Sequence, residues 1–266
     1  NGNLATFLFT HKSSENHDMG TGHPENPDRV RAVWGALDAP RFSDLERREA
    51  PSATIDQISR IHKRDYVESI LNSVPSEGLY RIDPDTAMSP SSGEAALTAA
   101  GAVIAAIDSV ISGEANNAFC AIRPPGHHAE PSRGMGFCLF NNVAIGAAHA
   151  RQNHGINHVA VVDFDVHHGN GTQAAFWSDP NVMFASSHEY PFYPGTGAQE
   201  ERGVGNIFNV PLASMSGSGE FRQGFEKIVF PALQEFKPGL IIISAGFDAH
   251  AKDPLANIRL QDEDFE

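Results

Sequence analysis

The stretch DFDVHHGNGT, residues 163–172, directly follows the apolar run VAVV. A short apolar run of this kind is typical of a buried strand, and extended backbone would place Asp163, Asp165 and His167 on one face. Carboxylate oxygens and a neutral imidazole nitrogen are ligands that a divalent metal accepts. The other interpretation is a solvated turn, which the letters GNG at 169–171 favour.

A second segment, AFCAIRPPGHH at 118–128, joins a strand-like run to a constrained loop that ends in His127 and His128. Proline fixes the backbone of such a loop, and glycine lets it bend sharply. A lone histidine is more often structural, but adjacent imidazoles offer two different nitrogens to one substrate. This arrangement suits general acid and base catalysis.

A third segment, LIIISAGFDAH at 240–250, is a continuous apolar run of the kind seen in strands that are buried on both faces, and it leads to Asp248. Open parallel sheets place their ligand sites at the carboxyl ends of strands, so Asp248 supplies a third metal ligand. Two carboxylates and one imidazole balance a divalent cation and leave coordination positions open. An open position is typical of a catalytic metal rather than a structural one.

Strand-like and helical patterns alternate along the chain, which indicates parallel β-α-β units. We expect strands near 4–10, 117–122, 158–164, 181–186, 206–210 and 239–244. We expect helices near 26–38, 64–73, 92–112, 140–153 and 219–236. Ser91 and Glu94 are spaced as a capping box for the longest helix. The fold class is therefore α/β, a single domain with an open, mostly parallel sheet flanked by helices.

These motifs resemble the histone deacetylase superfamily, most closely the bacterial class II type called histone deacetylase-like amidohydrolases. The matching stretches are HPENPDR at 23–29, RPPGHHAEPSRGMGFCLFNNVAI at 123–145, DFDVHHGNGTQAAFW at 163–177, HEYPFYPGTG at 188–197 and SAGFDAH at 244–250. The resemblance runs from about residue 4 to residue 266. It implies an arginase/deacetylase-like fold with a site at the carboxyl ends of strands, and one catalytic domain over residues 1–266.

The resemblance also implies a role for each site residue. The zinc ligands, one zinc per chain, are Asp165, His167 and Asp248. His128 matches the base that activates water, and His127 matches its electrostatic or proton-donating partner. Asp163 matches the carboxylate that orients His127, and Asn170 matches the partner of His128. Because an amide adds no charge, we expect His128 to be neutral at rest.

Further residues match the family's substrate channel and its monovalent cation sites. The channel is walled by Gly136, Phe137 and Tyr193, where two aromatic rings can sandwich a methylene chain. One potassium site would use oxygens of Asp163, Asp165, His167, Ser186 and Ser187. A second would use backbone oxygens of Phe176, Asp179 and Val182, together with Asn206.

The implied reaction is metal-assisted removal of acetyl or other acyl groups from lysine or related acylamines. The family's oxyanion donor is usually a tyrosine in a Gly-Gly-Tyr motif, and the tyrosines of this chain are Tyr66, Tyr80, Tyr190 and Tyr193. Tyr193 matches the channel wall, so the donor is not among them. Because every other catalytic position is present, we expect the chain to lack the C-terminal portion of its domain rather than to have a broken site.

Two other functions remain open beside the zinc-dependent deacylase. One is a module that binds acyl-lysine without efficient turnover, because it lacks the tyrosine. The other is an arginase-like hydrolase with two manganese ions, although His168 and His250 stand where a second metal would need aspartates.

Composition and charge indicate partners, localisation and redox state, but less specifically than the motifs indicate function. The formal net charge of −14 argues against nucleic-acid binding and mildly favours cationic substrates. We find no twenty-residue apolar segment and no signal-peptide pattern, and therefore expect a cytoplasmic protein, bacterial by its resemblance, without a membrane partner. Cys120 and Cys138 are too few for a disulfide framework, so we expect both to be reduced.

Overall fold

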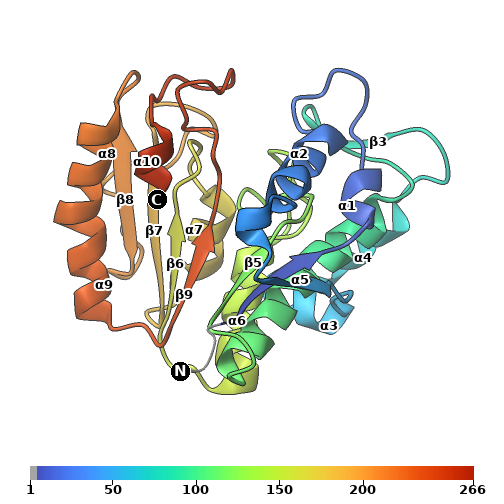
Figure 1. The fold of residues 1–266 in the computed structure, drawn as a ribbon, viewed down its shortest axis with the longest axis horizontal. Coiled ribbons are helices and arrows are strands. Elements are labelled where there is room, and N and C mark those ends of the chain that lie inside the picture. The colour runs from blue at the N-terminus through green and yellow to red at the C-terminus, as the bar shows by residue number, and fades with distance from the viewer. Residues whose placement is uncertain (1–4) are drawn as a thin grey trace. The chain divides into compact units, whose positions relative to one another are not determined.

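The computed structural model describes residues 5–266, which form two compact units, one up to Ala150 and one over Arg151–Glu266. Each unit contains its own strands and helices (Figure 1). The strand predicted near 4–10 is observed as β1, Thr6–Thr10, while its predicted start at residue 4 lies outside the described residues. One catalytic domain over residues 1–266 stays a prediction.

The first unit is built on a parallel sheet in the order β2-β1-β5 (Figure 1). Its flanking strands are β2, Leu45–Glu49, and β5, Asn117–Cys120. The middle strand β1 carries the buried core residues Phe7, Leu8 and Phe9, as expected for a strand with partners on both sides. A short antiparallel hairpin is formed by β3, Tyr80–Asp83, and β4, Thr86–Met88.

Helices complete the first unit. They are α1 (Ser13–Asn16), α2 (Pro27–Leu37), a 3-10 turn (Pro40–Phe42), α3 (Ile55–Ile58), α4 (Arg64–Asn72) and α5 (Ser92–Ile111). A further helix, α6 (Asn142–His154), begins in this unit and ends in the second. The start of α2 follows from its sequence, because the side chain of Asn26 accepts a hydrogen bond from the Asp28 backbone and Pro27 fits the first turn.

Helix α5 corrects one expectation. By length and composition alone it is long and apolar enough to cross a membrane, although no such segment was expected. Most of α5 is buried within the first unit. Ala100 and Ile104 pack in one apolar cluster with α3 and α4, whereas Ala102 and Ala106 pack beside β1. The helix is apolar on all sides because core residues surround it. The central helix of a globular domain and a membrane-spanning helix share this composition.

The second unit contains a parallel sheet in the order β8-β7-β6-β9 (Figure 1). Its strands are β6 (Val159–Asp163), β7 (Val182–Glu189), β8 (Ile207–Leu212) and β9 (Leu240–Ser244). Asp163 is in register with Ser186 on β7 and with Ser244 on β9. The carboxyl ends of these three neighbouring strands therefore meet at one edge of the sheet.

Helices flank this sheet. They are α7 (Asn170–Phe176), α8 (Ser218–Gly224), a π-helical turn (Phe225–Val229), α9 (Phe230–Phe236) and α10 (Asp262–Phe265). The helix predicted near 219–236 is confirmed as α8, the π-helical turn and α9 in succession. The turn interpretation of residues 169–171 is wrong, because α7 begins at Asn170.

The expectation that the run at 240–250 is buried on both faces is also wrong. Among residues 5–266, strand β9 pairs with β6 alone and lies at the edge of its sheet, and side chains on one of its faces are exposed. Ile241 is 50% exposed and Ile243 is 57% exposed, while Ile242 between them is buried. Parallel sheets flanked by helices nevertheless confirm the predicted α/β class.

Candidate functional site

The end of β6 turns sharply because aspartate side chains accept hydrogen bonds from the backbone that follows them. Asp163 accepts from the Asp165 amide at 3.0 Å, and Asp165 accepts from the His167 amide at 2.8 Å. Such local bonds, characteristic of Asp in turns, fix the chain without a regular strand. The two-residue spacing of the sequence therefore produces a rigid turn that carries polar side chains.

Asp248 reaches the same turn from the neighbouring strand. It follows β9, which pairs with β6, and its Oδ1 accepts a hydrogen bond from the Val166 amide at 2.8 Å. Its Oδ2 lies 3.0 Å from Nδ1 of His167, and Oδ1 of Asp165 lies 3.1 Å from the same nitrogen. The structure thus brings together all three residues that the sequence predicts as metal ligands.

Gly246 makes room for this cluster. A Cβ added at Gly246 would overlap the Asp165 carboxylate and lie 2.5 Å from its Cγ. Glycine is the residue that permits such a close approach of backbone and side chain. Sequence reasoning placed Gly246 within a matching motif but gave it no role.

The electrostatics of the cluster favour a cation. Burial alone would lower the pKa of His167, but hydrogen bonds to Asp165 and Asp248 and their charges raise it to about 10. Burial and the neighbouring charge of Asp165 raise the pKa of Asp248 to about 6. A ring held between two carboxylates keeps its proton, and that proton occupies the place where a metal cation would bind.

The donor set fits a divalent metal. One ligand atom from each of Asp165, His167 and Asp248 lies within 4.8 Å of the others. Donor atoms about 2.0–2.1 Å from a tetrahedral zinc are roughly 3.3 Å apart, close to the separations of 3.0 and 3.1 Å around His167 Nδ1. Three protein ligands also leave a fourth position for water or substrate, as in catalytic zinc sites.

Some of the residues predicted for potassium lie close together. Asp163 is fully buried and in register with Ser186. Asn206 Nδ2 faces three backbone oxygens. These belong to Phe176, Asp179 and Val182, at 2.8, 2.9 and 2.8 Å. An amide nitrogen has only two hydrogens for three acceptors, so this ring of oxygens is rich in acceptors for a cation.

The tandem histidines lie in the first unit, on the loop that follows β5. Both are buried, and their ring centroids are 4.0 Å apart. Gly136, at φ +56°, lies against the ring of His128. Phe137 also has a positive φ of 70°, and its amide donates to Thr86 Oγ1 at 2.9 Å. A bulky residue in this backbone region indicates a loop whose shape is strongly constrained.

Several residues predicted to be partners belong to different units. His127 and His128 belong to the first unit, whereas their predicted partners Asp163 and Asn170 belong to the second. Phe137 and Tyr193 are divided in the same way. These pairings stay predictions. Within the second unit, Tyr193 packs its ring edge-on to His167, with centroids 6.1 Å apart.

A buried polar network supports the Tyr193 loop and was missed by sequence reasoning. His188 places Nδ1 2.9 Å from Ser186 Oγ and Nε2 2.8 Å from the Gly197 backbone oxygen. Burial lowers the pKa of His188, so the ring is neutral and can join two such partners. The matching motif at 188–197 contained both His188 and Gly197, but nothing in its pattern indicated that they touch.

Comparisons with known proteins agree with these features. Residues 23–266 match the family described as Histone deacetylase domain. The "Histone deacetylase-like amidohydrolase" of Pseudomonas aeruginosa is 40% identical, over 92% of this chain and 66% of that protein. A "Probable deacetylase" of Methanothermobacter thermautotrophicus is 42% identical, over 97% of this chain and 79% of that protein.

A plant relative and a solved structure extend the likeness. "Histone deacetylase 14, chloroplastic" of Arabidopsis thaliana is 42% identical over 96% of this chain, which spans 65% of that protein. The crystal structure of the HDA15 HD domain matches with a TM-score of 0.95 and 33% identity, over 98% of this chain and 77% of that one. Both the resemblance and the fold class predicted from sequence are thereby confirmed.

Proposed function

The chain belongs to the histone deacetylase family, and we propose that it is a zinc-dependent amide hydrolase that removes acyl groups from lysine or a related acylamine. The observation that carries this proposal is the convergence of Asp165, His167 and Asp248 at the carboxyl ends of β6 and β9. Relatives named as deacetylases and as an amidohydrolase support the reaction class.

The three ligands would hold zinc with two negative charges and one neutral imidazole. When bound there, zinc would polarise the acyl carbonyl and lower the pKa of a bound water to roughly 7. Loading requires His167 to give up its proton, so metal binding releases a proton at neutral pH. The turn bonds from Asp163 to Asp165 and from Asp165 to His167 hold the ligands in place before the metal arrives.

We assign proton transfer to the tandem histidines. His128 would take the proton of the attacking water, with Asn170 accepting the Nδ1 hydrogen bond that fixes its tautomer. His127, oriented by Asp163, would stabilise negative charge or donate a proton to the leaving amine. Burial of both rings excludes bulk water and strengthens their interaction with a substrate.

We assign substrate placement to Gly136, Phe137 and Tyr193, whose apolar surfaces would line the path of the acyl-bearing side chain. Potassium would bind at the oxygens of Asp163, Asp165, His167, Ser186 and Ser187, and at those of Phe176, Asp179, Val182 and Asn206. The cluster of three backbone oxygens about Asn206 supports the second of these sites.

Zinc content and hydrolysis of a fluorogenic acetyl-lysine amide, measured on the same preparation, test the proposal. We expect about one zinc per chain and turnover in the wild type. His128→Ala should retain zinc and lose turnover, whereas Asp248→Ala should lose zinc. Full zinc occupancy in Asp248→Ala would overturn the ligand assignment. Zinc without turnover in the wild type would indicate an acyl-lysine-binding module instead.

A further inference from the structure

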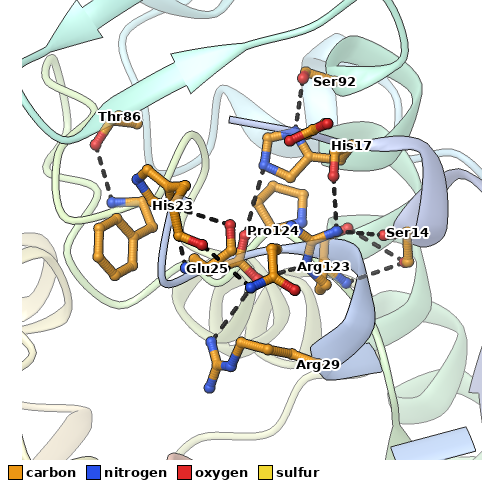
Figure 2. Close-up of polar contacts among 12 residues, drawn as sticks. Ser14, His17, His23, Glu25, Arg29, Thr86, Ser92, Arg123 and Pro124 are labelled. Carbon is orange, nitrogen blue, oxygen red and sulfur yellow. Dashed lines mark hydrogen bonds and ion pairs between the residues drawn. The ribbon is translucent and has the colours of Figure 1, made fainter. Parts of the chain in front are cut away.

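A buried ion pair lies at the entrance of the tandem-histidine loop (Figure 2). Arg123, 4% exposed, donates from Nε and Nη2 to the two carboxylate oxygens of Glu25, which is 1% exposed. The Nη2 bond is 2.5 Å long. Such a two-point contact between guanidinium and carboxylate fixes orientation as well as distance.

The same guanidinium also joins two backbone oxygens (Figure 2). Its Nη1 donates to the oxygens of Ser14 at 2.6 Å and His17 at 2.8 Å. The main chain of Arg123 is tied to the same segment, because its amide donates to Ser14 Oγ at 3.1 Å. Arg123 is therefore locked by backbone and side chain to residues 14–25.

Among the described residues, the other basic side chains near Glu25 bind it more weakly than Arg123 does. Arg29 lies 3.8 Å from Glu25, but its side chain is 54% exposed. His17 Nε2 lies 3.9 Å from Glu25, while its Nδ1 is 2.6 Å from Ser92 Oγ. Burial, followed by the charge of Arg123, lowers the pKa of His17 to about 3, so this ring is neutral. Arg123 is thus the main cationic partner of Glu25.

The loop from Arg123 to His128 is short, and further contacts hold it at Pro124 and Gly126. Asn142 Nδ2 donates to the Pro124 backbone oxygen at 3.2 Å. A Cβ at Gly126 would lie 2.7 Å from the Phe140 oxygen and 2.6 Å from the Asn142 amide. The loop between these contacts has little conformational freedom. The position of Arg123 therefore determines the position of His127.

The segment that carries Glu25 also supports Phe137. The Glu25 amide donates to His23 Nδ1 at 3.1 Å, and His23 Nε2 donates to the Asp85 oxygen at 2.8 Å. The His23 ring packs edge-on to Phe137, with centroids 4.8 Å apart (Figure 2 shows His23 and Glu25). One segment therefore contacts the residue that starts the histidine loop and a residue assigned to the substrate channel.

We propose that the Arg123–Glu25 ion pair is a positioning device that holds the tandem histidines where they can transfer protons. Neither residue touches the reacting atoms, so both act through the loop that they anchor. This inference rests on the proposed function, because it assumes that His127 and His128 move protons during amide hydrolysis.

Two conservative substitutions test the pair. Arg123→Lys keeps the charge but cannot reach four acceptors at once, and Glu25→Gln keeps the shape but removes the charge. We expect kcat per folded, zinc-loaded molecule to fall about 10- to 100-fold with little change in KM, since a small misplacement of a catalytic group costs this much. Arg64→Lys is the matched control, because Arg64 makes an exposed ion pair with Asp56 and Glu68.

A spectroscopic measurement separates this inference from the proposed function. The imidazole ¹⁵N resonances of His127 and His128, assigned with His127→Asn and His128→Asn, should shift in Arg123→Lys and Glu25→Gln while those of His167 stay in place. A structural role alone would lower the melting temperature without moving these signals. Absence of turnover in the wild type would defeat the proposed function, and the resonances would still report on positioning.

Ser14→Ala covers the case in which both ion-pair variants fail to fold. It removes the hydroxyl that contacts the Arg123 backbone but leaves the charges in place, and we expect a smaller shift of the same resonances and a smaller fall in kcat. Unchanged resonances and unchanged kcat in every folded variant would overturn the inference. Equal effects in Arg64→Lys would overturn it as well.

Discussion

A methyl group at Gly246 would overlap the Asp165 carboxylate. The absence of a side chain at Gly246 therefore allows Asp165 to keep its position in the metal site. Gly246→Ala should displace the carboxylate and weaken zinc binding by about 10- to 100-fold, the range seen when groups that orient metal ligands are changed. Competition with a chromophoric chelator measures the dissociation constant. Gly219→Ala is the control, because a Cβ at that position meets nothing within 4 Å. Equal zinc affinity in both variants would show that Asp165 relocates freely.

His62 makes the stability of the first unit depend on pH. Burial lowers its pKa to about 4, against an unfolded value of 6.5, and its Nε2 accepts a hydrogen bond from the Asn141 amide at 2.9 Å. The unfolded chain therefore binds the proton first as pH falls. The stabilisation by neutral His62 is complete above pH 6.5 and is lost down to about pH 4.

Lowering the pH from 7 to 5 should accordingly cost about 2 kcal/mol of unfolding free energy through His62 alone. Urea unfolding at the two pH values measures the loss. His62→Gln, which cannot take up the proton, should show a smaller loss than the wild type. An identical pH dependence in both proteins would assign the effect to other groups.

The candidate site illustrates which residues a sequence can reveal. Asp165 and His167 are neighbours in one motif, and Asp248 follows another apolar run, so their positions at strand ends predicted that they would lie together, and the family resemblance selected Asp165 rather than Asp163 as the ligand. Arg123 and Glu25 are 98 positions apart, and each stands in a motif that gives no sign of the other. Their pairing depends on how residues 14–25 fold against the end of β5, which local pattern does not encode.

Helix α3 depends on its N-cap residue, Thr54. Thr54 Oγ1 accepts from the Gln57 amide at 3.2 Å, and Gln57 Oε1 accepts from the Thr54 amide at 2.8 Å. A helix of four residues has few other bonds, and Thr54→Ala should cost about 1 kcal/mol of stability. Chemical denaturation checks this value. Thr54→Ser retains the hydroxyl and should behave like the wild type; equal losses in both would point to the methyl group.

Long elements were predictable, and short ones were not. The helices near 64–73 and 92–112 were predicted within a residue or two, because hydrophobic periodicity over many residues is a strong pattern. The short strands β2, β3 and β4 were missed, since three to five residues carry no clear period.

Two local predictions are wrong because the backbone adopts a helical conformation at the residues concerned. The capping box predicted at Ser91 is absent, because Ser91 has helical backbone angles and makes no side-chain cap bond, whereas a capping residue normally has extended ones. Asn170 starts a helix where the Gly-Asn-Gly letters favoured a turn. Composition alone does not distinguish a turn from the first turn of a helix.

At the scale of the whole molecule, zinc should act as a stabilising ligand. All three proposed ligands lie in the unit Arg151–Glu266, so zinc binding favours the folded state of that unit directly. Free zinc at a hundred times its dissociation constant should add about 2.7 kcal/mol. For a chain of this size, the melting temperature should rise by roughly 5–10 °C.

Scanning calorimetry with zinc and with chelator measures this shift. Asp248→Asn, which removes one ligand charge, serves as the control and should show little response to zinc. If saturating zinc moved no transition in the wild type, the ligand cluster would not be a metal site. A shift confined to one of two transitions would show that the units unfold independently.

The unpaired edge of β9, with its exposed isoleucines, affects how the chain behaves in concentrated solution. Within the described part of the chain, β9 is an edge strand that pairs on one side with β6, and Ile241 and Ile243 stand exposed. An edge strand with apolar side chains can act as a template on which another molecule adds a strand. Turbidity that grows with protein concentration, and that Ile243→Lys suppresses, would identify this edge as the seed of aggregation.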